Sequence, residues 1–156
     1  MTVLKNHINL SITSRRFFLP LLFLLLFSKS SCSKKSQYQN PYLQNLSFSY
    51  EINLNLPLYN SLKYANNSVL VDVDHVGIKG VIVFNTGSGY VAFEASDPNH
   101  SPSACSQMQP DQFTAKCSCE NNEYNLHNGQ IIRGTGNYGM KPYRISKSGN
   151  ILRIYN

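Results

Sequence analysis

One stretch of the chain, residues 45–56, alternates strictly between polar and apolar side chains. The polar residues are Asn, Ser or Glu, and the apolar ones are Leu46, Phe48, Tyr50, Ile52, Leu54 and Leu56. Successive side chains of a β-strand point to opposite faces, so a period of two is typical of a strand with one buried face. The stretch therefore predicts a half-buried strand and places this part of the chain in a sheet.

Short predicted strands separated by turns continue to the end of the chain. Residues 80–95, GVIVFNTGSGYVAFEA, place two β-branched or aromatic runs around NTGSG, whose glycines permit positive φ, and so predict a hairpin. No segment has a helical period. Further strands are predicted at 68–74, 112–116, 123–126, 143–146 and 151–155. The expected fold class is all-β, a small antiparallel β-sandwich or barrel.

The formal net charge of +6 is concentrated at the start of the chain. Lys5, Arg15, Arg16 and Lys29 precede Cys32 without any acidic residue, whereas ten Lys and Arg face eight Asp and Glu from Cys32 onward, a net charge of +2. Binding to nucleic acid needs a basic stripe on the folded surface. The charge pattern therefore argues against a nucleic-acid partner and indicates a targeting segment.

The first residues have the pattern of a secretory signal peptide. A basic start leads into the apolar run FFLPLLFLLLF, residues 17–27, which at about 1.5 Å per residue is too short to cross a bilayer of roughly 30 Å. Ser30 and Ser31 precede Cys32, and a polar segment follows. This arrangement resembles the bacterial lipoprotein signal, in which the cysteine becomes the acylated N-terminus, although Lys29 stands where that signal has a bulky aliphatic residue.

We therefore expect a signal peptide at 1–31, a lipid-anchor tether at 32–44 and a folded domain at 45–156. Acyl chains on Cys32 would anchor the protein to a membrane, with the domain outside the bilayer. A plain secretory signal, with Cys32 as an ordinary thiol, is the alternative. In both cases the protein is exported; with the anchor it is a membrane-bound lipoprotein of the bacterial cell envelope, periplasmic or on the surface.

Two loop motifs carry a family resemblance. AFEASDPN, residues 92–99, ends a predicted strand, and CSCENNEY, residues 117–124, runs from a cysteine to an aromatic residue. Together with the closing GMKPYRISKSGNILRIYN, these segments resemble the Rieske iron–sulfur domain over roughly residues 77–156. The resemblance implies a Rieske-like fold with two cluster-type loops at one end.

Carried over to this chain, the Rieske ligand positions fall at Asp97, Asn99, Cys117 and Glu120, where the family has Cys, His, Cys and His. A Rieske cluster needs two thiolates on one iron and two neutral imidazoles on the other. Only Cys117 keeps the family's residue, and carboxylates or an amide are poor substitutes for the other three. We therefore expect these positions not to bind a cluster, and the expected cofactor is none.

A shifted ligand set is the alternative. His100, Cys117, Cys119 and Glu120 are close in sequence and would supply nitrogen, sulfur and oxygen donors, although their spacing matches no tight metal-site template. The cofactor alternatives are thus a [2Fe–2S] cluster or a single iron or zinc ion. The competing interpretation is that His100 and His127 are solvated loop residues.

The same resemblance implies a disulfide between the two loops, and an exported domain meets an oxidising environment in which disulfides persist. High-potential Rieske proteins link their ligand loops by a bridge whose second cysteine corresponds to Cys119. Pro102 occupies the place of the first, and Cys105 lies three residues later. Cys105–Cys119 is the preferred pair and Cys105–Cys117 the alternative; either leaves one thiol unpaired.

No catalytic set of residues has supporting context in the sequence. GTGNYG, residues 134–139, lacks the Lys-Ser or Lys-Thr of a phosphate-binding loop, and we expect it near the cluster-site end, close to the family's third loop. The sequence favours a non-enzymatic envelope lipoprotein whose Rieske-like domain has lost its cluster and serves as a binding or structural module, with an unknown protein partner at the loop tips. The alternative is a Rieske-type electron-transfer protein with an atypical iron–sulfur or mononuclear metal site.

Overall fold

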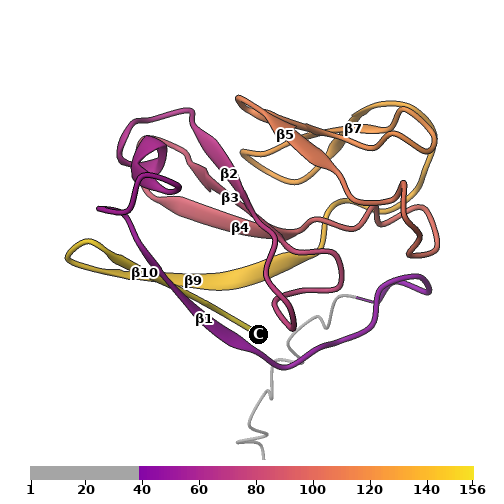
Figure 1. The fold of residues 1–156 in the computed structure, drawn as a ribbon. Helices are drawn as coiled ribbons and strands as arrows, with labels where there is room; N and C mark the ends of the chain where they lie inside the picture. Colours follow the sequence, from indigo (N-terminus) through magenta and orange to yellow (C-terminus); the bar gives the residue numbers. More distant parts are fainter. Residues whose placement is uncertain (1–38) are drawn as a thin grey trace, which may run out of the picture. The chain divides into compact units, whose positions relative to one another are not determined.

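The structure is a computed structural model that describes residues 39–156 (Figure 1). The predicted signal peptide, the acylation site Cys32 and most of the predicted tether lie outside the described residues. Within residues 39–156, no helix is long and apolar enough to cross a membrane.

Nearly all of the regular structure in residues 39–156 is β-strand. The only helical element in this range is the short 3₁₀-helix η1 (Asn60–Lys63). The strands are β1 (Ser49–Asn53), β2 (Ser68–Val71), β3 (Val81–Asn85), β4 (Tyr90–Glu94), β5 (Gln109–Asp111), β6 (Thr114–Lys116), β7 (Glu123–Asn125), β8 (Ile131–Arg133), β9 (Pro142–Ser148) and β10 (Ile151–Tyr155). The all-β class predicted from the sequence is confirmed.

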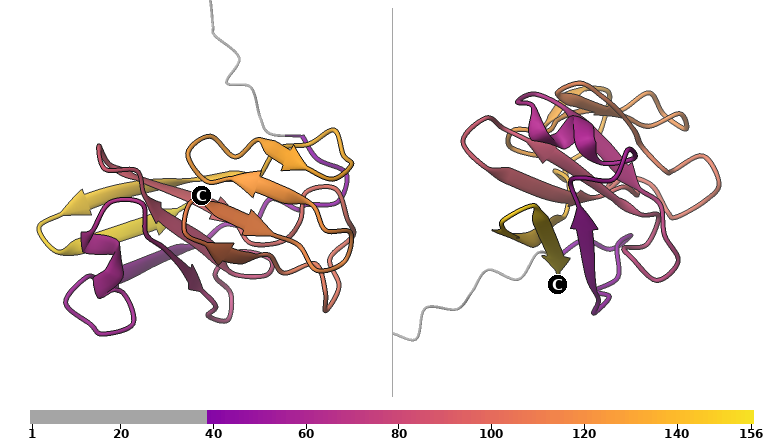
Figure 2. Two further views of the ribbon diagram at one scale, coloured as in Figure 1. Left: turned by 90° about the horizontal axis from the view of Figure 1, so that it is seen from above. Right: turned by 60° about the vertical axis from the view of Figure 1, so that its left-hand side comes forward.

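The strands form two sheets in which every pair is antiparallel (Figures 1 and 2). One sheet has six strands in the order β1-β10-β9-β4-β3-β2, and the other has four in the order β5-β6-β7-β8. The four-stranded sheet is a simple meander inserted between β4 and β9. Its loops therefore emerge next to the point where β4 ends, which is where the first loop motif begins.

The hairpin of β3 and β4 lies between two apolar clusters. All five residues of β3 are buried, because alternate side chains on opposite faces of a strand here meet a core on each face. Val81 and Val83 pack with Ile52 of β1 and Leu152 of β10. Ile82 and Phe84 pack in the second cluster, with Ala115 of the four-stranded sheet, Ala95 of the first loop motif and Tyr124 of the second. The predicted hairpin around NTGSG is confirmed.

The alternating stretch 45–56 is a strand over a shorter range than its pattern predicts. Strand β1 covers only Ser49–Asn53, which pairs with β10 from Tyr155 to Ile151. Beyond it, the side chain of Asn53 accepts a hydrogen bond from the Asn55 backbone N–H at 2.9 Å, and the Leu56 backbone N–H donates to the Asn53 carbonyl at 3.1 Å. These bonds turn the chain, so Leu56 is 49% exposed instead of continuing the buried face.

The sequence patterns did not predict β5 or β8, and they placed the start of β6 two residues too early. Residues 112–113 were expected to begin a strand, but they form the turn between β5 and β6. Gln112 has a φ of 53°, which a strand does not allow. A positive φ is usually signalled by glycine or asparagine, and here no such residue marks the turn.

Candidate functional site at the two loops

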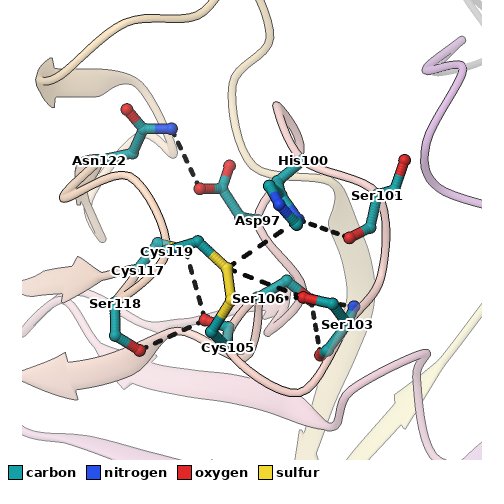
Figure 3. The surroundings of a disulfide bond; sticks show 10 residues. All are labelled: Asp97, His100, Ser101, Ser103, Cys105, Ser106, Cys117, Ser118, Cys119 and Asn122. Carbon is teal, nitrogen blue, oxygen red and sulfur yellow. Dashed lines mark hydrogen bonds between the residues drawn. A yellow bond between two sulfur atoms is a disulfide. The ribbon is translucent and has the colours of Figure 1, made fainter.

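Three loops gather around the two motifs. The first joins β4 to β5 and contains Asp97 and Asn99, the second joins β6 to β7 and contains residues 117–122, and the third joins β8 to β9 and contains GTGNYG. A disulfide between Cys105 and Cys119 links the first loop to the second (Figure 3). The preferred pairing is confirmed, and among the described cysteines Cys117 is the free, buried one.

Asp97, the first Rieske ligand position, is fully buried and occupied by hydrogen bonds. Its Oδ1 accepts from the Tyr124 hydroxyl at 2.6 Å and from the Asn99 backbone N–H at 2.8 Å. Its Oδ2 accepts from Asn122 Nδ2 at 3.1 Å (Figure 3). The carboxyl group therefore fastens the first loop to the second, because two of these three donors belong to the segment that begins at Cys117.

Asn99, the second ligand position, joins the third loop to this network. Its Nδ2 donates to the Tyr124 hydroxyl at 2.9 Å and to the Tyr138 carbonyl at 2.8 Å, which uses both amide hydrogens. Its Oδ1 accepts from the backbone N–H groups of Asn137 at 2.9 Å and Tyr138 at 3.0 Å. The amide of Asn99 thus has every hydrogen-bonding group engaged within the protein.

Two glycines of the third loop make this contact possible. A Cβ added at Gly136 would collide with the side chain of Asn99, and one at Gly134 would collide with Asn122. Gly134 also has a φ of 97°, which residues with a side chain rarely adopt. GTGNYG therefore lies against the two motifs as expected, and its glycines serve close backbone packing.

Burial sets the protonation of the titratable groups beside the network. The pKa of Tyr124 is raised, first by burial and then by its hydrogen bond to Asp97. Burial is also the main reason why the pKa of the Cys117 thiol is raised. Cys117 is 0% exposed, and its Sγ donates to the Cys105 carbonyl at 3.6 Å. At neutral pH Tyr124 and Cys117 are both protonated, so Tyr124 donates to Asp97 and Cys117 is a neutral thiol.

The shifted metal set is not assembled into one site. Glu120 is exposed, the sulfur of Cys119 is bonded to Cys105, and His100 directs Nδ1 to the Ser101 carbonyl at 2.5 Å. In residues 39–156 there is no group of three or more His, Cys, Asp and Glu side chains that could hold a metal ion. His127 is exposed and packs edge-on against Phe84 with ring centroids 4.8 Å apart.

These residues do not fit the [2Fe–2S] cluster that the Rieske resemblance implies. Such a cluster requires two thiolates and two imidazoles. Cys117 is the one thiol among the four positions, and the polar atoms of Asp97 and Asn99 are used by protein donors and acceptors. At Asp97 and Asn99, two of the four positions, the polar side-chain atoms are thus engaged in hydrogen bonds within the protein.

Sequence reasoning missed a second buried polar centre below the first loop. Glu94 is 0% exposed, and its carboxylate accepts from the backbone N–H groups of Ile78, Lys79 and Ser96 at 2.7–2.9 Å and from the Tyr143 hydroxyl at 2.6 Å. Lys141, also buried, has a lowered pKa because of burial, which the charge of Glu94 partly offsets. The sequence signal for this centre is Glu94 near the end of the apolar run 81–95, because a carboxylate buried in a sheet needs several hydrogen-bond donors around it.

Comparisons with known proteins show similarity in fold only. No protein-family model matches the chain, and no curated protein matches it. A chain of the complex of reduced oxygenase and oxidized ferredoxin in carbazole 1,9a-dioxygenase matches with 12% identity and a TM-score of 0.44, over 58% of this chain and 82% of that chain. Sphingomonas yanoikuyae B1 ferredoxin matches with 12% identity and a TM-score of 0.44, over 60% and 88%.

A third solved structure is the terminal oxygenase of carbazole 1,9a-dioxygenase from Novosphingobium sp. KA1, with 12% identity and a TM-score of 0.45, over 72% of this chain and 30% of that chain. All three identities are 12%, and all three TM-scores are below 0.5. No cofactor, partner or activity of those proteins is carried over to this chain.

Proposed function

We propose that this protein is an exported, lipid-anchored envelope protein whose Rieske-like domain has exchanged cluster binding for an internal hydrogen-bond network and serves as a binding or structural module. The observation that supports the proposal is the saturation of Asp97 and Asn99 by protein groups. A ligand position whose lone pairs and protons are already used has little to offer a metal, and breaking the network would leave buried polar atoms unpaired.

The network also suits a module that presents loops. Asp97, Asn99, Asn122 and Tyr124 hold three loops together beneath the surface, while the exposed residues of the first two loops include Ser101, Pro102, Cys105, Glu120 and Asn121. Loops on a rigid base are a common arrangement for binding, because their shape does not have to be ordered on contact. The proposed partner is a protein that contacts these loop tips.

Metal analysis is the first test. The full chain, exported and purified without oxygen, is assayed for iron, zinc and acid-labile sulfide, and its visible spectrum is recorded. We expect a colourless protein with iron and sulfide far below one equivalent. Near-stoichiometric iron and sulfide with a coloured spectrum would overturn the proposal and support the alternative of an electron carrier with an atypical cluster.

A rebuilt site provides the matched control for that assay. The triple variant Asp97→Cys, Asn99→His and Glu120→His restores the family's residue types beside Cys117. Wild type and variant are incubated with iron and sulfide under reducing, anaerobic conditions. We expect only the variant to take up iron and sulfide; near-stoichiometric uptake by the wild type as well would contradict the proposal, because it would mean that the network does not prevent loading.

Site-specific photo-cross-linking tests the binding role. A photo-reactive amino acid replaces Ser101 in the first loop or, as the control, Ser148 at the β9–β10 turn; both positions are exposed. In intact cells we expect one discrete adduct from position 101 and none from 148. Equal labelling at both positions, or none at either, would argue for a purely structural role.

A further inference from the structure

The disulfide at the loop tips is unequally exposed at its two ends. Cys105 is exposed at the surface of the first loop, whereas Cys119 in the second loop is partly buried. A thiolate attacks a disulfide along the axis of the sulfur–sulfur bond and must therefore reach one sulfur from the side away from the other. The exposure favours attack on the sulfur of Cys105, with Cys119 as the leaving group.

Two hydrogen-bond donors stand beside the sulfur that would leave. His100 Nδ1 lies 4.0 Å and Ser103 Oγ 3.7 Å from Cys119 Sγ, and Ser103 Oγ also lies 3.4 Å from Cys105 Sγ (Figure 3). His100 Nδ1 also contacts the Ser101 carbonyl oxygen at 2.5 Å. Since a carbonyl oxygen only accepts hydrogen bonds, Nδ1 carries the proton. The Ser103 hydroxyl can donate to Cys119 Sγ, and the Nδ1 hydrogen of His100 can be shared between the Ser101 carbonyl and this sulfur; such donors stabilise a thiolate.

The two loops have a second connection that does not involve the disulfide. Asp97 and Asn99 of the first loop are hydrogen-bonded to Asn122 and Tyr124, which follow Cys119 in the chain. These bonds are buried or partly buried, and none of them involves a cysteine. Opening the disulfide therefore leaves Cys105 and Cys119 near each other, so that the bond can form again.

From these three observations, we propose that Cys105–Cys119 is a thiol–disulfide exchange site whose substrate is an exposed thiol of a partner molecule. The partner thiolate attacks Cys105 Sγ, a new sulfur–sulfur bond forms, and the bond to Cys119 Sγ breaks. The electron pair of that bond goes to Cys119, which leaves as a thiolate beside His100 Nδ1–H and the Ser103 hydroxyl. This proposal rests on the exposure and contacts of the disulfide and does not depend on the proposed binding role of the loop tips.

The exchange is balanced by a second thiol of the partner. It attacks the partner's own sulfur in the mixed disulfide, which releases Cys105 and completes a disulfide in the partner. Two thiols are thereby oxidised, and the disulfide of this protein gains two electrons and two protons. The reverse sequence oxidises the protein again. Cys117 takes no part, because its thiol is buried and bonded to the Cys105 carbonyl.

Reduction kinetics test the role of the two donors. The oxidised full chain is mixed with reduced glutathione at pH 7, and free thiols are counted over time by alkylation and mass spectrometry. We expect His100→Ala and Ser103→Ala each to slow reduction by about tenfold, because each removes one donor to the leaving thiolate. Ser103→Thr keeps the hydroxyl and should reduce at the wild-type rate. His127→Ala, a histidine variant with no contact to the disulfide, should also leave the rate unchanged.

Two further readouts decide between exchange and a purely structural bridge. Peptide mapping of acid-quenched samples should place the first bound glutathione on Cys105. Circular dichroism of the reduced protein should show a folded domain. Reduction only in denaturant, glutathione on Cys119, unchanged rates in both donor variants, or an unfolded reduced state would each overturn the proposal.

Discussion

Asp97 lies where the Rieske resemblance places the first cluster ligand. A cysteine at this place would present one sulfur to a metal, whereas the carboxyl group accepts three hydrogen bonds at 2.6–3.1 Å from within the domain. Buried carboxylates are retained where several donors compensate for lost water. Tyr124 has the central role among these donors, because its hydroxyl both donates to Asp97 and accepts from Asn99.

We expect Tyr124→Phe to lower the free energy of unfolding by about 2–3 kcal/mol, because hydrogen bonds to charged groups contribute more than neutral ones. Chemical denaturation measures the change. Tyr90→Phe is the matched control: its hydroxyl donates at 3.1 Å to the Leu62 carbonyl, a neutral acceptor, and its loss should cost about 1 kcal/mol. Equal losses in the two variants would mean that the Asp97 bond has no special weight.

At the scale of elements, the domain is organised by the insertion of the four-stranded sheet between β4 and β9. The first loop leaves β4, the second connects β6 to β7 and the third returns to β9, so all three meet beside one another. The third loop reaches Asn99 and Asn122 because glycine stands at positions 134 and 136. Its sequence alone could equally belong to a solvated turn.

We expect Gly134→Ala to destabilise the domain by about 2 kcal/mol, through its positive φ and the collision of the new Cβ with Asn122. Thermal unfolding measures the shift. Gly89→Ala is the control, since a Cβ there meets nothing within 4 Å. If both glycine variants unfold alike, the third loop does not pack tightly against Asn122 in solution.

At the scale of the whole domain, buried tyrosines make stability depend on alkaline pH. Burial raises the pKa of Tyr59 to about 12, and it also raises the pKa values of Tyr124 and Tyr143. The ordinary pKa of a tyrosine, which applies in the unfolded chain, is 10.0. A tyrosine whose pKa is raised on folding stabilises the folded state fully below pH 10, and this contribution falls as the pH rises from 10 through the folded pKa.

We therefore expect the free energy of unfolding to fall above pH 10, by about 1.4 kcal/mol per pH unit for each buried tyrosine. Urea denaturation at a series of pH values between 8 and about 11.5 measures the slope. Tyr124→Phe should reduce the slope by the contribution of one buried tyrosine. Tyr64→Phe, at an exposed position, should leave the slope unchanged. A flat profile above pH 10 would contradict the burial of these hydroxyls.

Membrane anchoring, as proposed above, would be a property of the whole molecule and would depend on acylation of Cys32. We expect cells fed a labelled fatty acid to incorporate it into the wild type and not into Cys32→Ser, and we expect the variant to leave the membrane fraction. Cys117→Ser, which keeps Cys32, is the control and should be labelled normally. Labelling of Cys32→Ser would refute acylation at this residue, and an unlabelled but secreted wild type would favour the plain signal peptide.

The sequence by itself determined the all-β class and the central hairpin, and it favoured Cys105–Cys119 over the alternative pair Cys105–Cys117. These features follow from local patterns: the period of two, the glycines of NTGSG and the resemblance of two loop motifs to a known family. The sequence did not predict where β1 ends or that the chain turns at Gln112. The side chain of Asn53 turns the chain after β1, and Gln112 adopts a positive φ that no glycine signals.

Only the tertiary structure decided what Asp97 and Asn99 contact. The residue types of Asp97 and Asn99 mark them as poor metal ligands, but their hydrogen-bond partners Asn122, Tyr124 and Tyr138 lie 25 to 39 residues away along the chain. Hydrogen bonds of this kind depend on orientation and distance, which a linear pattern does not contain. The contacts of His100 and Ser103 with Cys119 Sγ likewise depend on the folded structure.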